Sequence, residues 1–109
     1  MNEKDRELVV ELKRKLSSDP GNHLRRIIVF GSRVRSDEAE ESDLDVIALV
    51  DEKSADIERR LEDIVYQAMW DYDFKPIISL KVFSESRFNN ALSKGFSFYR
   101  HVQKEGVAV

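Results

Sequence analysis

The chain has 109 residues, of which 18 are Lys or Arg and 21 are Asp or Glu, so its net charge is −3. This length corresponds to one domain, and the acidic balance argues against a nucleic-acid module that works by bulk neutralisation of phosphates. The chain lacks cysteine, which excludes disulfides and thiolate metal sites, and no apolar run approaches the length of a membrane span. We therefore expect a single domain over residues 1–109 that lies in the cytoplasm without membrane association.

The first half of the chain is predicted to form one helix and two strands. Leucines and valines at helical spacing predict an amphipathic helix over residues 3–16. The run LRRIIVF, residues 24–30, predicts a strand that Gly31 and Ser32 interrupt, and a short turn or helix follows. The run DLDVIALV, residues 43–50, predicts a second strand. It is apolar on both faces after its aspartates, which is typical of a central position in a sheet.

The second half is predicted to form a long helix, a third strand and further helices. Ser54 caps the long helix, whose apolar stripe ends at Tyr72. The run KPIISLKVF, residues 75–83, predicts a strand. Ser84 caps a further helix, and a last helical stretch covers residues 98–104. This order of elements predicts a small domain of the α/β or α+β class.

Two aspartates stand at the start of the second predicted strand. Asp43 and Asp45 are two residues apart, so their side chains point to the same face, while Leu44 and Val46 point to the other. Two carboxylates about 4 Å apart repel by a few kcal/mol at an effective dielectric constant of about 20. Either one of them takes up a proton or a cation lies between them. A hard divalent ion such as Mg²⁺ suits such a pair.

The Gly31-Ser32 turn supplies features that suit a phosphate. A glycine after a buried strand lets a phosphate approach the backbone, the Ser32 hydroxyl adds a donor, and Arg33 or Arg35 adds positive charge. Each motif alone is weak, since Gly-Ser is a common turn and D-x-D can cap one. Their joint placement on neighbouring predicted strands indicates a nucleoside triphosphate pocket, and the chemistry typical of it is nucleotidyl transfer.

These residues match the pattern of a known family. Gly31-Ser32, ten further residues and Asp43-Leu44-Asp45 resemble the G-S-x10-D-x-D signature of the polymerase β-like nucleotidyltransferases. The small size and the closing FYRHVQKEGVAV resemble the minimal nucleotidyltransferase (MNT) group of that superfamily. The resemblance implies a small mixed β-sheet flanked by helices, ATP as substrate, and Mg²⁺ held by Asp43 and Asp45. The residues that it implies for holding the triphosphate are Gly31, Ser32, Arg33 and Arg35.

The resemblance also implies a partner. Members of the MNT group are commonly antitoxins that bind a helical HEPN ribonuclease toxin and attach AMP to a tyrosine near its active site. By this resemblance the chain is an adenylyltransferase in a type VII-like toxin–antitoxin pair and forms a hetero-oligomer with the toxin. Adenylylation of a small molecule such as an aminoglycoside usually needs a second domain, and the acidic balance disfavours an RNA-directed transferase.

One departure from the family pattern leaves an alternative open. Catalytic members generally place a third carboxylate on the neighbouring strand, and the matching position here is Ser79. Serine is neutral and a poor base, while Lys81 on the same face brings positive charge. The alternative is a binding module of the same fold that has lost turnover and neutralises the toxin by contact.

Aromatic residues gather in two segments. Trp70, Tyr72 and Phe74 lie at the end of the long helix, where we expect core packing rather than contact with a partner. For the second aromatic group, core packing and contact with a partner both stay open, because the segment is C-terminal. This group consists of Phe96, Phe98 and Tyr99.

Overall fold

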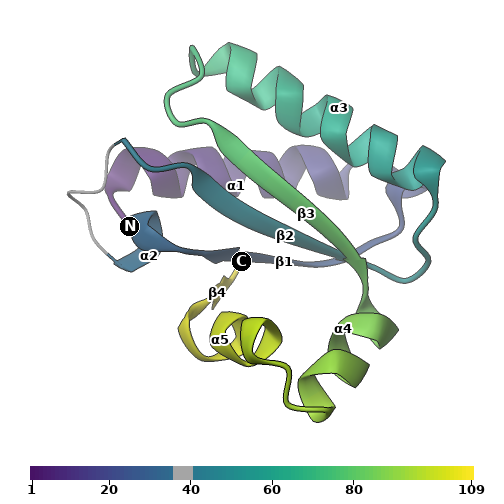
Figure 1. Ribbon diagram of the computed structural model, residues 1–109. Helices are drawn as coiled ribbons and strands as arrows, with labels where there is room; N and C mark the ends of the chain where they lie inside the picture. Colours follow the sequence, from purple (N-terminus) through teal and green to yellow (C-terminus); the bar gives the residue numbers. More distant parts are fainter. Residues whose placement is uncertain (36–40) are drawn as a thin grey trace.

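The computed structural model describes residues 1–35 and 41–109. A four-stranded sheet carries helices on both faces (Figure 1). The elements in chain order are α1 (Glu3–Ser17), η1 (Pro20–Asn22), β1 (Leu24–Phe30), α2 (Ser32–Arg35), β2 (Leu44–Val50), α3 (Ala55–Asp71), β3 (Ile78–Ser84), α4 (Glu85–Ser93), α5 (Ser97–Glu105) and β4 (Val107–Ala108).

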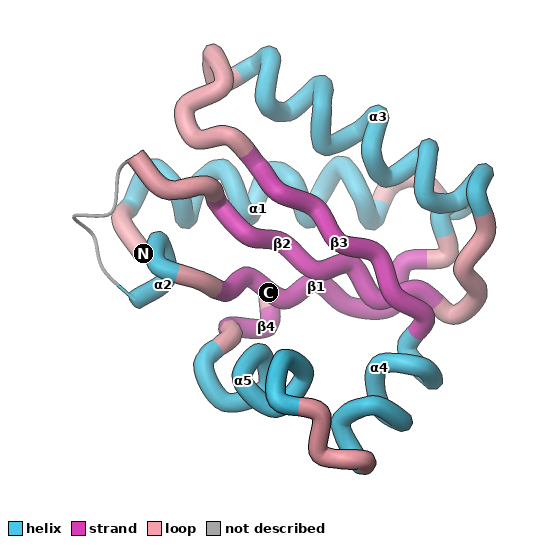
Figure 2. The backbone as a smooth tube through the Cα atoms, viewed as in Figure 1, coloured by secondary structure: helices cyan, strands magenta, loops and turns pink. Residues whose placement is uncertain are grey.

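The sheet is mixed, with the strand order β3-β2-β1-β4. β1 pairs antiparallel with both β2 and β4, while β2 and β3 run parallel and are joined by the crossover helix α3. The predicted fold class, a small mixed sheet flanked by helices, is therefore confirmed. β2 lies inside the sheet, as its two apolar faces predicted (Figure 2).

The two faces of the sheet bury different sets of side chains. α1 and α3 cover one face, where Leu12 and Leu61 pack against alternate strand residues such as Val46. α4 and α5 cover part of the other face, where Phe88 and Val102 pack against a smaller group of strand residues. That group is Ile28, Ile47 and Leu49. Because side chains alternate along a strand, Asp45 lies on the face of α4 and α5.

Local signals placed the helix starts correctly. The Ser54 hydroxyl accepts a hydrogen bond from the backbone N–H of Ile57, and Ser84 accepts one from the N–H of Arg87, so both predicted caps are confirmed. No helix in residues 1–35 and 41–109 is long and apolar enough to cross a membrane.

Three details differ from the predictions. β3 begins at Ile78 rather than at residue 75, beyond Pro76, which cannot donate to a strand ladder. Val107 and Ala108 form a fourth strand on the edge of β1, which their two-residue length did not indicate. Tyr72 packs against the core as expected, but the core role expected for Trp70 is wrong, because this side chain is 57% exposed.

Candidate nucleotide and metal site

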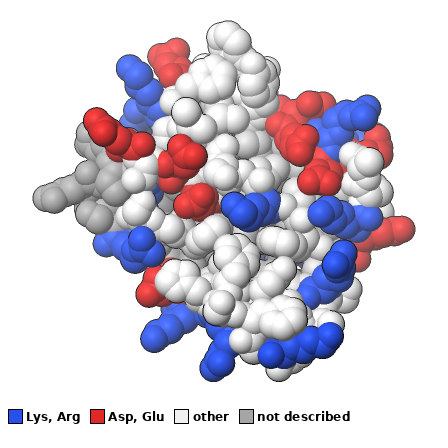
Figure 3. All heavy atoms as spheres, in the orientation of Figure 1, with Lys and Arg blue, Asp and Glu red and all other residues white. Residues whose placement is uncertain are grey.

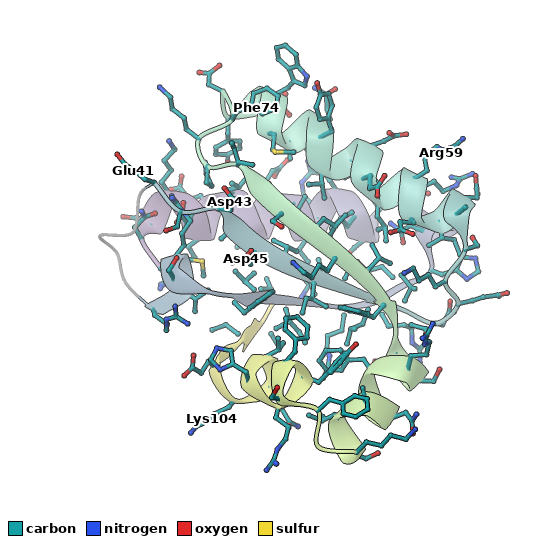
Figure 4. All side chains as sticks on the ribbon, in the orientation of Figure 1. Glu41, Asp43, Asp45, Arg59, Phe74 and Lys104 are labelled. Atoms are coloured by element: carbon teal, nitrogen blue, oxygen red, sulfur yellow. The ribbon has the colours of Figure 1, made fainter. Side chains whose placement is uncertain are left out.

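The two aspartates lie at the amino end of β2 (Figure 4). Asp43 directly precedes the strand and is exposed, while Asp45 is its second residue and is half-buried. Asp45 pairs with Phe30 of β1 on one side and with Ser79 of β3 on the other. The central strand therefore holds a partly desolvated carboxylate between the end of β1 and the start of β3.

The Gly-Ser turn directly adjoins this carboxylate. Antiparallel pairing brings the end of β1 beside the start of β2, and Gly31 follows Phe30 with a φ of +93°. A Cβ atom built on Gly31 would meet the Oδ2 atom of Asp45. The two halves of the motif, which are separated in the chain, therefore lie against each other, and only glycine fits between them.

Ser32 and Arg35 lie on the single turn of α2 that follows Gly31. Ser32 opens the helix and is half-buried. Arg35 is exposed, and its Nη1 atom lies 3.4 Å from Oε2 of Glu105 on α5. Both residues are close in the chain to the Gly31 turn, so both remain available for a triphosphate at this end of the sheet.

Arg33 has a different environment from the one predicted. Its Nε and Nη2 atoms donate to Asp5 at 2.9 and 2.8 Å, and its Nη1 donates to the carbonyl of Ser42 at 3.0 Å. Both side chains of the pair are buried, at 6% and 2% exposed. The guanidinium thus holds α1 and the residue before Asp43. Arg33 also lines the cavity that adjoins Asp43, so its contact with a phosphate stays a prediction.

Sequence reasoning missed Asp5, although the chain carries a signal for it. Asp5 is three residues before Leu8 and four before Val9, so it lies on the apolar face of α1. A carboxylate on the buried face of a helix requires a cation, because an unpaired buried charge is strongly unfavourable. The signal indicates a buried ion pair but does not identify Arg33 as the partner.

The electrostatics of Asp45 fit a cation site. Burial raises the pKa of the Asp45 carboxyl above its ordinary value, Lys81 lowers it, and the neighbouring Asp43 raises it. A bound cation would relieve both the desolvation and the repulsion between the carboxylates. Two carboxylates suit one Mg²⁺, which completes its octahedron with water and phosphate oxygens.

The neighbouring strand contributes a serine and a lysine. The parallel register sets Ser79 beside Asp45 and Lys81 beside Ile47, on the same face of the sheet. Within residues 1–35 and 41–109, no group of three or more His, Cys, Asp or Glu side chains is placed to hold a metal ion. A metal held by Asp43 and Asp45 would therefore take its remaining ligands from water and phosphate oxygens.

A cavity of about 330 Å³ opens on the outer side of Asp43. Its wall includes Lys4 at the start of α1 and the segment from Phe74 to Ile77 before β3. Asp45, Gly31 and Ser32 do not line it, so this cavity adjoins the carboxylate pair rather than containing it. It offers space for part of a substrate next to Asp43.

A mixed sheet with one carboxylate on its inner strand β2, a second directly before that strand, and a Gly-Ser turn packed against the first is typical of nucleotide-dependent group-transfer domains. The family model described as nucleotidyltransferase domain matches residues 8–106. The chain belongs to this family, which supports general nucleotidyl transfer as its activity. No curated protein and no solved structure gave a significant match.

Proposed function

We propose that the protein transfers AMP from ATP to a tyrosine hydroxyl of a HEPN-type ribonuclease toxin, and thereby acts as its antitoxin. The observation that carries the nucleotidyl transfer is the contact between the Gly31 turn and the Asp45 carboxylate. The family match supports the reaction class, and the MNT-like motif and ending support the acceptor.

Each residue of the site has a defined part in this proposal. Asp43 and Asp45 would hold Mg²⁺, and the ion would supply positive charge that stabilises the charge developing on the phosphate oxygens. Gly31 lets the triphosphate approach the backbone, Ser32 donates a hydrogen bond to it, and Arg35 adds positive charge. The acceptor oxygen forms a bond to the α-phosphorus of ATP, and the bond to the bridging oxygen breaks. Pyrophosphate leaves, and the proton of the acceptor passes to a base.

A protein acceptor is favoured by exposed apolar side chains next to the site. Phe74 and Ile77 line the cavity beside Asp43, and Ile77 is 53% exposed. Phe74 also contacts the rings of Tyr66 and Trp70, both of which are exposed on α3. An apolar surface of this kind is typical of a protein–protein contact. A toxin bound there would present its hydroxyl close to the carboxylate pair.

A second candidate function has its own supporting observation. Ser79 occupies the position next to Asp45 where a third carboxylate would serve as metal ligand or base. A domain with this substitution could neutralise the toxin by contact alone, without transferring AMP. In the adenylylation proposal, the base is then supplied by the partner.

The experiment that separates these functions combines the purified protein, a HEPN toxin and ATP labelled at the α-phosphate. We expect Mg²⁺-dependent label on a toxin tyrosine, which Asp43→Asn abolishes and the exposed control Asp63→Asn on α3 retains. Protection of RNA from the toxin without any label would favour the contact-only function. If Asp43→Asn transferred label at the wild-type rate, the adenylylation proposal would be wrong.

A further inference from the structure

We propose that a second cavity, at the end of the sheet opposite Asp43 and Asp45, binds a small aromatic phosphate of the nucleotide class. The cavity has a volume of about 400 Å³ and lies between α4, the start of α5 and the loop that follows β2. This volume falls within the range of small-molecule sites, which begins at roughly 300 Å³. The site is distinct from the carboxylate pair and does not depend on the function proposed above.

The apolar part of the cavity is aromatic. Phe83 at the end of β3 and Phe96 before α5 both lie against Tyr99, with ring centroids 5.7 and 6.5 Å from it. Phe96 is 55% exposed, although its ring belongs to this cluster. An exposed ring at the edge of an aromatic cluster is a surface on which a nucleobase can stack.

The polar part of the cavity is cationic. Lys53, Arg87 and Lys94 line it, and none of its described lining residues is acidic. Among residues 1–35 and 41–109, no carboxylate forms an ion pair with Arg87 or Lys94, and Lys53 only reaches Glu58 at 4.0 Å. Figure 3 shows basic side chains gathered on this part of the surface, over α4. In a chain with a net charge of −3, such a group favours a phosphate ligand.

The topology of the sheet also favours a ligand at this position. β2 and β3 are parallel, and their carboxyl ends, Val50 and Ser84, pair with each other beside the cavity. In open α/β sheets, ligands bind outside the carboxyl ends of parallel strands. Asp45 lies five residues earlier on β2, about 17 Å away at the rise of an extended strand. One bound mononucleotide cannot therefore occupy both sites.

The ligand that these features describe is a single nucleotide. The aromatic surface suits a base, and the guanidinium of Arg87 and the ammonium of Lys94 suit a terminal phosphate. Asn90, which also lines the cavity, carries the amide donors and acceptor that can hydrogen-bond a base edge. A cavity of this size holds one nucleotide, and the acidic surface elsewhere disfavours a long nucleic acid.

The test is calorimetric titration with AMP in Mg²⁺-free buffer, using wild-type protein and the Asp43→Asn/Asp45→Asn variant. Without Mg²⁺, the site at Asp43 and Asp45 is not expected to bind nucleotide in either protein. Wild type and the double variant should therefore bind AMP with equal affinity. We expect Arg87→Gln/Lys94→Gln to weaken binding by about tenfold or more, because the variant loses two charge-assisted contacts to the phosphate. Phe96→Ala is expected to weaken it severalfold. The control Arg59→Gln/Lys104→Gln removes the same charge from exposed residues that do not line the cavity (Figure 4).

Ligand comparisons decide what the cavity recognises. We expect AMP to bind more tightly than either adenosine or inorganic phosphate, because only AMP uses both the rings and the cations. Absence of AMP binding, equal binding by Arg87→Gln/Lys94→Gln, or phosphate binding as tight as AMP would each overturn the proposal. Much tighter binding of a single-stranded oligonucleotide would replace it with a nucleic-acid surface. Circular dichroism of each variant verifies its fold, which exposed substitutions should preserve.

Discussion

Gly31 and Asp45 are packed so closely that the glycine has no room for a side chain: its Cβ would meet the Asp45 carboxylate. The backbone of Gly31 also has a φ of +93°, a conformation that other residues rarely adopt. The turn after β1 and the strand β2 are therefore fitted to each other at this point, and the geometry of the candidate site depends on that contact.

Gly31→Ala is therefore expected to destabilise the fold by about 1–3 kcal/mol and to weaken binding of Mg²⁺ and ATP. Urea unfolding measures the first effect and calorimetry the second. Gly95→Ala is the matched control, since Gly95 also has a positive φ of +79° but its Cβ would meet only Arg100 at 3.8 Å. It should lose stability and keep its affinity for Mg²⁺, which is measured without nucleotide because Lys94 and Phe96 beside Gly95 line the second cavity. Loss of Mg²⁺ affinity in both variants would contradict a specific role for Gly31.

The ion pair between Asp5 and Arg33 predicts an asymmetric mutational response. Arg33→Met leaves the buried Asp5 carboxylate without its main partner and should lower the free energy of unfolding by about 3–5 kcal/mol. Asp5→Leu/Arg33→Met removes both charges, and we expect it to recover most of that loss. Urea denaturation of the two variants measures the difference. A double variant as unstable as Arg33→Met would indicate that Arg33 acts through packing or through Ser42 instead.

The raised pKa of Asp45 predicts a pH-dependent cost in stability. The folded-state pKa of the Asp45 carboxyl lies above its unfolded-state value. The contribution of this carboxyl to the free energy of unfolding is therefore most favourable below the unfolded-state pKa. That contribution is lost as the pH rises through the folded-state pKa. Asp45→Asn should therefore unfold at a higher temperature than wild type at pH 7 without divalent ions, and this advantage should vanish in acid.

The control for this effect is the addition of Mg²⁺ at pH 7. Binding to the carboxylate pair should stabilise wild type and leave Asp45→Asn unchanged, because a ligand stabilises only the state that binds it. Scanning calorimetry at several pH values measures both effects. An Asp45→Asn variant that is less stable than wild type at pH 7 in metal-free buffer would contradict this account.

The position of Ser79 beside Asp45 predicts the effect of a restored carboxylate. Ser79→Asp should tighten Mn²⁺ binding, measured by electron paramagnetic resonance, because three carboxylates then face the ion. It should also lower stability in metal-free buffer through repulsion of like charges. Ser97→Asp, at the exposed start of α5, is the control. Unchanged Mn²⁺ affinity in Ser79→Asp would show that residue 79 does not face the metal.

Local patterns in the chain determined the helices, their caps and the three long strands. Alternation and helical spacing reflect burial of one face, and Ser54 and Ser84 satisfy backbone donors within three residues, so these features need no distant contact. The spacing of Gly31, Asp43 and Asp45 also indicated the candidate site, since two strands joined by a short connection pair as neighbours.

Only the tertiary structure decided which side chains meet. The buried pairing of Arg33 with Asp5 joins residues 28 positions apart, and the exposure of Trp70 depends on how α3 packs against the rest of the chain. The cationic cavity of Lys53, Arg87 and Lys94 likewise exists because a parallel crossover brings the loop after β2 beside α4. Sequence patterns report the period of burial along one element, whereas a contact between elements depends on how the whole chain packs.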